Sequence, residues 1–414
     1  MEAVTVSAPQ QTVERGWPAV TAVVTADGNR YEIFYRASRG PLALSAEPFL
    51  AAALLPAMKI GAPVHIAGPV SPRLLAQAGK FQEIMCTWYR DLHRVPVEAE
   101  GQLPAGAPAP LEIGCFFSGG IGSSYSALKR QTELAALVFV HSFDILLSDE
   151  TVRMTVTDNL RQAAAELHKP LIEVETNVRK LLDQYVTWGE HSLGAALASV
   201  ALALSPQFQK VYIPSSFPYS HLFPWGSHPL TDPLWSTERT QIVHDGCEAS
   251  RWQKLERLAG NATARLYLRV CGQQTDGASN CCRCPSCLGV MAYLRLAGRQ
   301  EQFPTFARRL DLDELAHMPI TDGASRMNGR LLLEAVERTG SDPQMAQALH
   351  TCLNLPEGYD AVDKYEEDLQ QTNARIAMLR LQIRRVQSSR SWRWTAPLRA
   401  GADLLRRASK SGQS

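Results

Sequence analysis

Short apolar runs alternate with longer amphipathic segments through the middle of the chain, from about residue 111 to residue 215. The runs have the length of strands, and the segments between them have the length of helices. The predicted strands are Ile113–Phe117, Ala136–Val140, Leu171–Glu175 and Val211–Pro214, and the predicted helices start after Ser124 and cover Glu150–Leu167, Val178–Trp188 and Leu193–Leu204. This alternation is typical of an α/β fold with a doubly wound parallel sheet.

The first hundred residues show a different pattern. Two alternating segments, Pro18–Ala26 and Tyr31–Ala37, flank the turn Asp27-Gly28-Asn29, which predicts a β-hairpin. Further predicted elements are helices at Pro48–Met58 and Pro72–Tyr89, with a strand around Pro63–Ala67. The Pro/Ala/Gly-rich stretch Gly101–Pro110 reads as a linker. We therefore expect a small α/β N-terminal domain (residues 1–100), a linker (101–110) and an α/β domain over 111–312.

The C-terminal part has helical periodicity throughout. A helical segment is expected over 313–360, including helices at Leu331–Thr339 and Asp342–Leu353. A heptad pattern then runs from Tyr365 to Val386, which favours a short coiled coil, and hence a homo-oligomer, over a lone packed helix. The end of the 361–414 segment mixes arginine and tryptophan, which suits a membrane surface or a partner protein; a solvated tail explains it equally well.

Composition limits the class of protein. The chain has 414 residues, 45% hydrophobic and 20% charged, with a net charge of +1, so no global charge points to nucleic acid. No basic segment followed by an apolar core opens the chain, and no apolar stretch is long enough to span a membrane. These features predict a cytoplasmic protein. Five of nine cysteines fall within Cys271–Cys287, which favours metal binding over disulfides.

A glycine- and serine-rich loop, Ser118–Ser124, follows the first strand of the α/β domain and opens a helix. Glycines allow backbone N–H groups to approach an anion, serine hydroxyls add donors, and the helix dipole favours negative charge. A tight turn would use the same residues. Two further polar loops, His141–Asp144 and Ser215–Ser220, also follow predicted strands, and ligands of such sheets bind at the carboxyl ends of strands.

The loop resembles the PP-loop of the ATP pyrophosphatase (adenine nucleotide α-hydrolase-like) superfamily, whose usual form is SGGxDS. The resemblance implies a Rossmann-like fold, binding of ATP and Mg²⁺, adenylation of a substrate oxygen and release of pyrophosphate. It assigns nucleotide binding to Ser118, Gly119, Gly120, Gly122, Ser123 and Ser124. The loop lacks the Lys-Ser/Thr ending of a Walker P-loop, so cleavage of that type is not indicated.

Gly122 stands where this superfamily has an aspartate, which would orient magnesium or the loop. Turnover of ATP therefore depends on another carboxylate. Asp144 is the first candidate for a catalytic role, with Asp149 and Glu150 as alternatives. Asp144 could equally be a loop or helix-capping residue.

The cysteines form the pattern C-x9-C-x2-C-x2-C, with Cys282 left over. Four thiolates at this spacing can close a tetrahedral zinc site, whose role would be structural because zinc keeps no open position. An iron–sulfur cluster is the minor alternative. The expected ligands are Cys271, Cys281, Cys284 and Cys287.

An SGG loop followed by this cysteine pattern resembles the 7-cyano-7-deazaguanine synthase family of the queuosine pathway. The resemblance covers about Leu111–Gly298 and implies ATP-dependent conversion of a carboxylate through an adenylate, beside a four-cysteine zinc site. The family's threonine-lysine motif would fall near Ser236–Glu238, where this chain has glutamate. The additional N-terminal domain and tail also depart from the family, so we expect a diverged relative with another substrate. The tail itself resembles the ends of bacterial surface-polysaccharide proteins, which suggests a pathway.

A polar stretch, Phe223–Gly246, precedes the cysteines. Its ionisable residues are candidates for substrate contacts, although a structural role is the better interpretation for each singly: His228, Asp232, Glu238, His244 and Asp245. On the next predicted helix, Arg251 and Lys254 lie one turn apart and could stabilise phosphate charge, or form a solvated face.

Together these features predict an enzyme, a PP-loop ligase that adenylates a carboxylate or amide-type oxygen of a small molecule for nitrogen or sulfur transfer. The expected cofactors are ATP, Mg²⁺ and Zn²⁺, and the predicted catalytic residues are Asp144, Arg251 and Lys254. The alternatives are an RNA-modifying PP-loop enzyme, which the low net charge disfavours, and an inactive nucleotide-binding scaffold.

Overall fold

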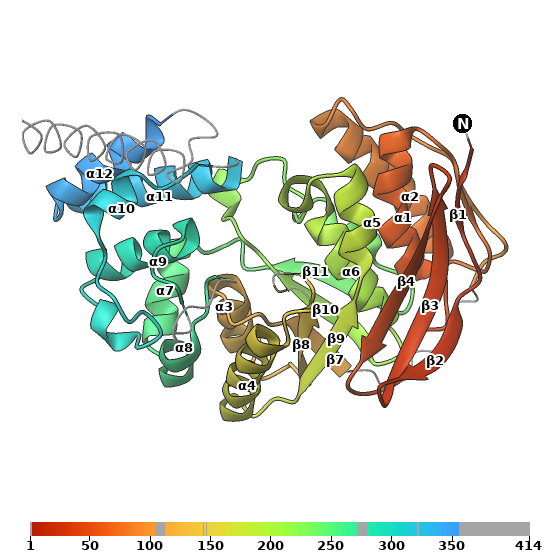
Figure 1. Cartoon of the computed structure of the whole chain (residues 1–414), viewed down its shortest axis with the longest axis horizontal. Helices are drawn as coiled ribbons and strands as arrows, with labels where there is room; N and C mark the ends of the chain where they lie inside the picture. Colours follow the sequence, from red (N-terminus) through yellow and green to blue (C-terminus); the bar gives the residue numbers. More distant parts are fainter. Residues whose placement is uncertain are drawn as a thin grey trace, which may run out of the picture.

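The computed structural model describes residues 2–103, 112–143, 145, 147–271, 280–320 and 323–355. Within these residues the chain is an α/β protein with one mixed sheet of eleven strands (Figure 1). The strands lie in the order β11-β10-β7-β8-β9-β4-β3-β1-β5-β6, and β2 pairs with β3. Asp144, the predicted coiled coil and the arginine/tryptophan tail lie outside the described residues.

Five parallel strands make up one half of the sheet. They are β7 (Glu112–Phe116), β8 (Ala136–His141), β9 (Leu171–Thr176), β10 (Phe208–Pro214) and β11 (Gln241–Asp245). Four of them match the strands predicted from apolar runs, and β11 is additional. Every residue of β8 is buried, which explains why its sequence is almost uniformly apolar instead of alternating.

Helices cover both faces of this parallel half. Its helices are α3 (Ile121–Lys129), α4 (Glu150–Glu166), α5 (Val178–Tyr185) and α6 (Leu193–Ala203). Phe116, Val138 and Val140 belong to the apolar core that contains residues of α5 and α6. Cys115 and Leu137, which point the other way along the same strands, pack with residues of α3 and α4.

The N-terminal residues extend the same sheet. Their elements are β1 (Val4–Val6), β2 (Gln10–Glu14), β3 (Trp17–Ala26), β4 (Asn29–Ala37), β5 (Val64–Ile66), β6 (Val97–Ala99), α1 (Glu47–Ile60) and α2 (Pro72–Trp88). The predicted hairpin is present as β3 and β4, and Asp27 and Gly28 both have positive φ, as a tight hairpin turn requires. Strand β4 pairs antiparallel with β9. The separate parallel sheet expected from the sequence is therefore part of a larger mixed sheet.

Polar side chains fix the contact between β4 and β9. The Arg36 Nε donates to Glu175 Oε2 over 2.6 Å, and both residues are buried. Beside this pair, Asn177 accepts a hydrogen bond from the Phe34 N–H at 3.0 Å and donates to the Glu32 carbonyl at 2.7 Å. A buried charge pair with these hydrogen bonds specifies one register between the two strands.

The C-terminal region is a helical unit with its own apolar core (Figure 1, cyan and blue). It contains α7 (Arg251–Ala259), α8 (Ala262–Tyr267), α9 (Pro285–Leu296), α10 (Leu312–Ala316), α11 (Gly323–Thr339) and α12 (Pro343–Leu353). The helices predicted near residues 331–339 and 342–353 fall within α11 and α12. Across the part of the chain that the structure describes, no helix has the length and apolar character needed to cross a membrane.

Candidate functional site

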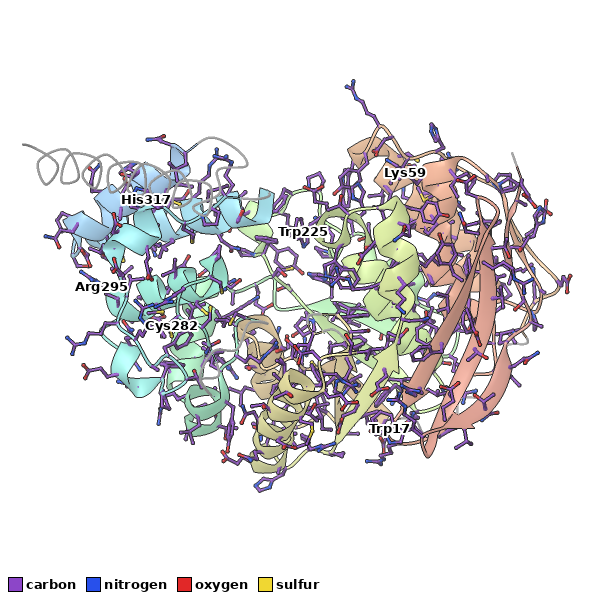
Figure 2. All side chains as sticks on the ribbon, viewed as in Figure 1. Trp17, Lys59, Trp225, Cys282, Arg295 and His317 are labelled. Atoms are coloured by element: carbon purple, nitrogen blue, oxygen red, sulfur yellow. The ribbon has the colours of Figure 1, made fainter. Side chains whose placement is uncertain are left out.

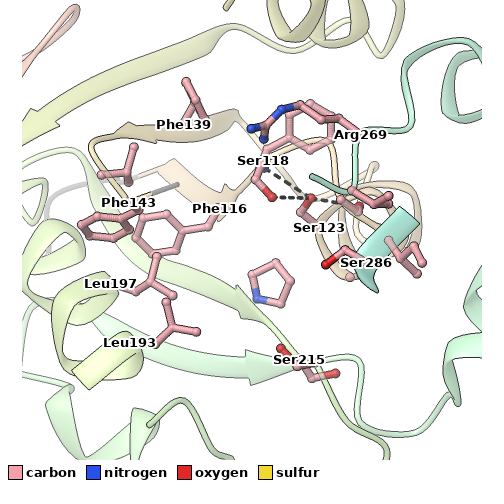
Figure 3. Close-up of a pocket in the computed structure, with 18 of the residues that line it drawn as sticks. Phe116, Ser118, Ser123, Phe139, Phe143, Leu193, Leu197, Ser215, Arg269 and Ser286 are labelled. Carbon is pink, nitrogen blue, oxygen red and sulfur yellow. Dashed lines mark hydrogen bonds between the residues drawn. The ribbon is translucent and has the colours of Figure 1, made fainter. Parts of the chain in front are cut away.

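A cavity of about 710 Å³ opens at the carboxyl ends of β7, β8 and β10 (Figure 3). Its wall combines residues of the glycine-rich loop, of helix α7 and of the cysteine segment. These three segments are far apart in the sequence and were each singled out by their residue types. The cavity thus brings the predicted loop, the predicted cations and two of the predicted cysteines to one place.

The glycine-rich loop forms the floor at the start of α3. The Ser118 N–H donates to Ser123 Oγ at 3.3 Å, and Ser123 Oγ donates to the Gly120 carbonyl at 3.1 Å. Helix α3 begins at Ile121, and its N-cap residue Gly120 provides no side-chain cap. Because Ile121, Gly122 and Ser123 line the cavity, the positive end of the helix borders it.

Gly122 is a glycine for a steric reason. A Cβ at this position would lie 2.8 Å from the backbone oxygen of Ser215, at the end of β10. No side chain fits there unless the helix or the strand shifts. The close approach of α3 to β10 therefore accounts for the absence of the expected aspartate.

Two of the predicted loop residues do not line the cavity. Gly119 has a φ of +75°, and its carbonyl accepts a hydrogen bond from the Arg269 N–H at 2.9 Å. The Ser124 side chain lines a separate cavity of about 10 Å³, together with residues of α4 and α8. Gly119 shapes the turn and Ser124 packs behind it, whereas Ser118, Gly120, Gly122 and Ser123 face the open space.

Arg251 and Lys254 line the cavity from the first turn of α7. The Lys254 side chain is 2% exposed, and its Nζ donates to the carbonyl and the hydroxyl of Ser215 at 2.9 and 2.8 Å. Burial lowers the pKa of Lys254 to about 8 and lowers the pKa of Arg251 as well. Lys254 is therefore not part of a solvated face.

Two more cations line the cavity and were not predicted. Arg269, which is buried, follows α8, and Arg179 comes from α5. The Arg179 guanidinium lies 4.3 Å from the ring centre of Trp188, donates to the Phe143 carbonyl at 2.6 Å and pairs with Asp183 at 3.0 Å. Neither arginine belongs to a recognisable motif, so only the fold reveals them.

The opposite end of the cavity is mainly apolar, with Arg179 at its edge against Trp188. It is lined by side chains from β7, β8, the loop after β8, and the turn and helix that follow α5: Phe116, Val138, Val140, Phe143, Trp188, Leu193 and Leu197. The Phe143 and Trp188 rings pack edge to face, with centroids 5.0 Å apart. The cavity therefore has one end suited to a planar apolar group and another suited to an anion.

The four predicted cysteine ligands converge beside the cavity. One sulfur from each of Cys271, Cys281, Cys284 and Cys287 lies within 4.8 Å of the others. The Cys281 and Cys287 sulfurs are 3.7 Å apart. Zinc–sulfur bonds of about 2.3 Å in a tetrahedron give sulfur separations of about 3.8 Å, so this set fits a metal such as zinc.

Hydrogen bonds hold the cysteine segments in place. The Cys281 N–H donates to Cys271 Sγ at 3.3 Å, and the Cys284 N–H donates to Cys281 Sγ at 3.2 Å. Hydrogen bonds from Cys284 and Cys287 lower the pKa of the Cys271 thiol. Asn280 joins both segments by accepting from the Val270 N–H and donating to the Leu268 carbonyl. The spare Cys282 is buried in the adjoining helical core (Figure 2).

The remaining predicted polar residues lie outside the cavity wall. Asp232 Oδ2 and His244 Nδ1 form a buried pair at 2.7 Å. Although burial opposes protonation, the hydrogen bond to Asp232 raises the pKa of His244 to about 9, whereas burial lowers that of His228 to about 4. Glu238 instead binds Ser71 and the Arg73 N–H at the start of α2.

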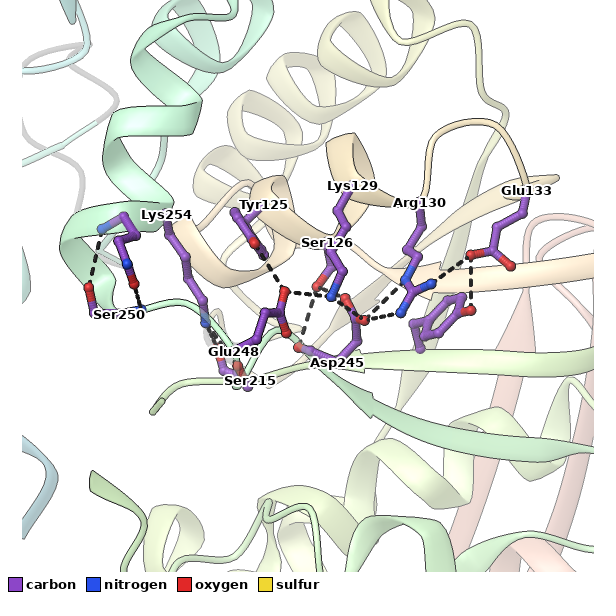
Figure 4. A network of polar contacts seen from close by, with 12 residues as sticks. Tyr125, Ser126, Lys129, Arg130, Glu133, Ser215, Asp245, Glu248, Ser250 and Lys254 are labelled. Carbon is purple, nitrogen blue, oxygen red and sulfur yellow. Dashed lines mark hydrogen bonds and ion pairs between the residues drawn. The ribbon is translucent and has the colours of Figure 1, made fainter. Parts of the chain in front are cut away.

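Two other acids have structural partners. Asp245 accepts hydrogen bonds from Ser126, Lys129 and Arg130 of α3 (Figure 4). Asp149 caps α4 by accepting from the Val152 N–H at 3.1 Å. Neither Asp245 nor Asp149 lines the cavity, so neither of these two carboxylates is placed to act at the glycine-rich loop.

Comparison of the chain with protein-family models, with curated proteins and with solved structures finds no significant match. What is established is the α/β fold, the cavity and a four-cysteine cluster that could hold a metal.

Proposed function

We propose that this chain binds ATP in the 710 Å³ cavity and uses it to adenylate an oxygen of a small molecule. The observation that carries the proposal is the convergence of the SGG loop, the N-terminus of α3 and the α7 cations on one wall of that cavity. Backbone donors at a helix start together with cationic side chains form a phosphate site. The parallel half of the sheet is, on this proposal, a Rossmann-like doubly wound unit of the PP-loop type.

The two ends of the cavity give the nucleotide an orientation. Adenine binds at the apolar end, where Phe116, Phe143 and Leu197 provide a surface for a planar ring. The phosphates lie toward Ser118, Ser123 and the α7 cations. A cavity of this size accommodates the nucleotide and a small acceptor together.

The reaction has two steps. The acceptor's carboxylate or amide-type oxygen attacks the α-phosphorus, the bond to the β-phosphate oxygen breaks, and pyrophosphate leaves as the adenylate forms. A nitrogen or sulfur nucleophile then attacks the activated carbon, and AMP departs with the acceptor's oxygen. The chain's cations stabilise the charge that builds on the leaving pyrophosphate, which is the main contribution a protein makes to this chemistry.

The four cysteines are proposed to hold one structural zinc ion. Bound zinc would tie the segments on either side of residues 272–279 together, because its four ligands come from both. In the segment before Cys271, the Arg269 N–H donates a hydrogen bond to the Gly119 carbonyl of the loop. Zinc thus supports the phosphate site without taking part in the reaction.

The test is product analysis with α-labelled ATP, magnesium and a panel of candidate acids with ammonium or a sulfur donor. AMP and pyrophosphate, formed only with an acceptor, would support adenylation. ADP as the product, or a complete lack of nucleotide binding, would refute it. Metal analysis of the purified protein tests the cysteine site, and less than about half an equivalent of zinc would contradict it.

A second candidate is a nucleotide-binding protein that does not turn ATP over. The lack of space at Gly122 favours this second function, because the Ser215 carbonyl leaves no room for the expected carboxylate. Stoichiometric ATP binding with intact nucleotide recovered after every trial would identify this function.

A further inference from the structure

We propose that Arg251, Lys254 and Arg269 form a cationic clamp that binds the nucleotide phosphates directly, so that ATP binding does not require Mg²⁺. The inference rests on the proposed ATP site and specifies that the site binds ATP without a magnesium ion. Most nucleotide sites neutralise phosphate charge partly with a magnesium ion held by carboxylates. The geometry of this cavity points to protein cations in that place.

Within the described part of the chain, the two α7 cations of the cavity wall, Arg251 and Lys254, have no ion-pair partner. Lys254 is 2% exposed, and the hydrogen bonds that the structure gives its Nζ go to two neutral oxygens of Ser215. Among the described residues, no carboxylate lies within ion-pair distance of Lys254 or of its neighbour Arg251. A buried cation without an anion is costly, and a bound polyphosphate would supply the missing charge.

The nearest acids are already neutralised. Asp245 receives hydrogen bonds from Lys129 and Arg130, and Glu248 pairs with Lys129 and accepts from Tyr125 (Figure 4). Neither acid lines the cavity, and no aspartate or glutamate is found among the described residues of its wall. The wall as described is therefore cationic, with Arg179 as a fourth positive group.

The loop itself has no space for a magnesium-binding carboxylate. A Cβ at Gly122 would lie 2.8 Å from the Ser215 carbonyl, the same oxygen that accepts a hydrogen bond from Lys254. Lys254 of α7 and a side chain at position 122 would therefore meet at the same carbonyl oxygen.

The experiment is calorimetric titration of the full-length chain with sodium ATP, in magnesium-free buffer and with millimolar magnesium chloride. Zinc content is measured before and after, so that the cysteine site stays loaded. We expect the two dissociation constants to agree within about threefold. Inorganic pyrophosphate is expected to bind without magnesium as well, because the clamp recognises phosphate charge.

Variants identify the residues. Arg251→Gln is expected to weaken magnesium-free ATP binding about tenfold or more, and Arg251→Lys to restore most of it. Arg257→Gln on the same helix is the matched control, since its guanidinium lies over Tyr125 outside the cavity wall. Thermal melting of each variant checks that it is folded.

The outcomes separate this inference from the proposed function. ATP binding that appears only with magnesium, or that survives Arg251→Gln unchanged in magnesium-free buffer, overturns the clamp and leaves the ATP site standing. A lack of ATP binding under both conditions overturns the clamp and the proposed function together.

Discussion

Two groups of charged side chains lie near the carboxyl ends of β10 and β11 and are built in opposite ways. In one group, the Asp245 carboxylate receives hydrogen bonds from Ser126, Lys129 and Arg130, and its neighbour His244 forms a buried pair with Asp232. In the other, Lys254 is equally buried, but the hydrogen bonds that the structure gives its Nζ go to the neutral oxygens of Ser215.

This difference in pairing separates charged groups that stabilise the fold from a charged group that is available to bind a ligand. A compensated pair costs stability when one partner is removed, because the other is left buried and unpaired. An uncompensated cation already carries that cost in the folded protein. Its removal should therefore affect ligand binding far more than folding. Three predictions test this contrast, and a fourth tests the close approach of α3 to β10.

The largest effect is expected for Asp232→Asn, which leaves His244 without its counter-ion. Against the effect of burial, Asp232 and, after it, Cys247 raise the pKa of His244 from 6.5 to about 9, which corresponds to about 3 kcal/mol in the free energy of unfolding, with Asp232 as the main contributor. That contribution is fully present below pH 6.5 and is lost as the pH rises through 9. Urea unfolding at pH 6 measures it.

The control for this variant is Asp183→Asn, which breaks the exposed pair with Arg179 and should cost about 0.5 kcal/mol. Equal losses in the two variants would mean that burial of the Asp232–His244 pair has no special weight.

Lys254→Met should reverse the pattern. At pH 7 the free energy of unfolding is expected to stay within about 1 kcal/mol of the unmodified chain or to rise, because an uncompensated buried charge is gone. ATP binding should weaken about tenfold or more. Urea unfolding and calorimetry on the same preparation measure both. A large loss of stability with ATP binding retained would place Lys254 among the fold-holding charges.

Gly122→Ala should destabilise the protein by about 1–3 kcal/mol, because its Cβ meets the Ser215 carbonyl at 2.8 Å. The matched control is Gly79→Ala in the middle of α2, where a Cβ has no neighbour within 4 Å. That change should stabilise the helix by about 0.5–1 kcal/mol. Thermal melting of the two variants gives opposite signs if the close approach of α3 to β10 is real.

The smallest effect concerns pH. Burial lowers the pKa of Lys254 to about 8, so the free protein loses this charge between pH 7.5 and 9, and ATP binding should weaken by up to about tenfold across that range. In Lys254→Met the same pH change should leave the affinity nearly constant. An identical pH profile in both proteins would assign the titration to another group.

Local patterns in the sequence located much of the candidate site. The Ser118–Ser123 loop and the C-x9-C-x2-C-x2-C spacing are short motifs, and each motif carries its chemistry within a few residues. The predicted strands near them are present because short apolar runs determine buried strands. In the polar stretch before the cysteines, Asp232 and His244 have the structural role that was the better interpretation for each residue singly, since they form a buried pair.

The features that were missed depend on distant contacts. Arg179 on α5 and Arg269 after α8 reach the cavity because of the tertiary packing, and an isolated arginine in a sequence looks like any surface residue. The pairing of β4 with β9 was missed for the same reason, since neither strand identifies its partner locally. The steric reason for glycine at position 122 depends on the position of the Ser215 carbonyl, which the sequence does not give.

The pairing of β4 with β9 in one sheet also determines the order in which parts of the sheet can form during synthesis. Arg36 of β4 is separated from Glu175 of β9 by 139 positions in the chain. At roughly 5–20 residues per second, a ribosome takes on the order of 7–30 s to cover that distance. During this interval the β3–β4 hairpin has an unpaired edge at what becomes the interior of the sheet. That edge therefore stays open to pairing with other chains until β9, the strand that covers it, has emerged.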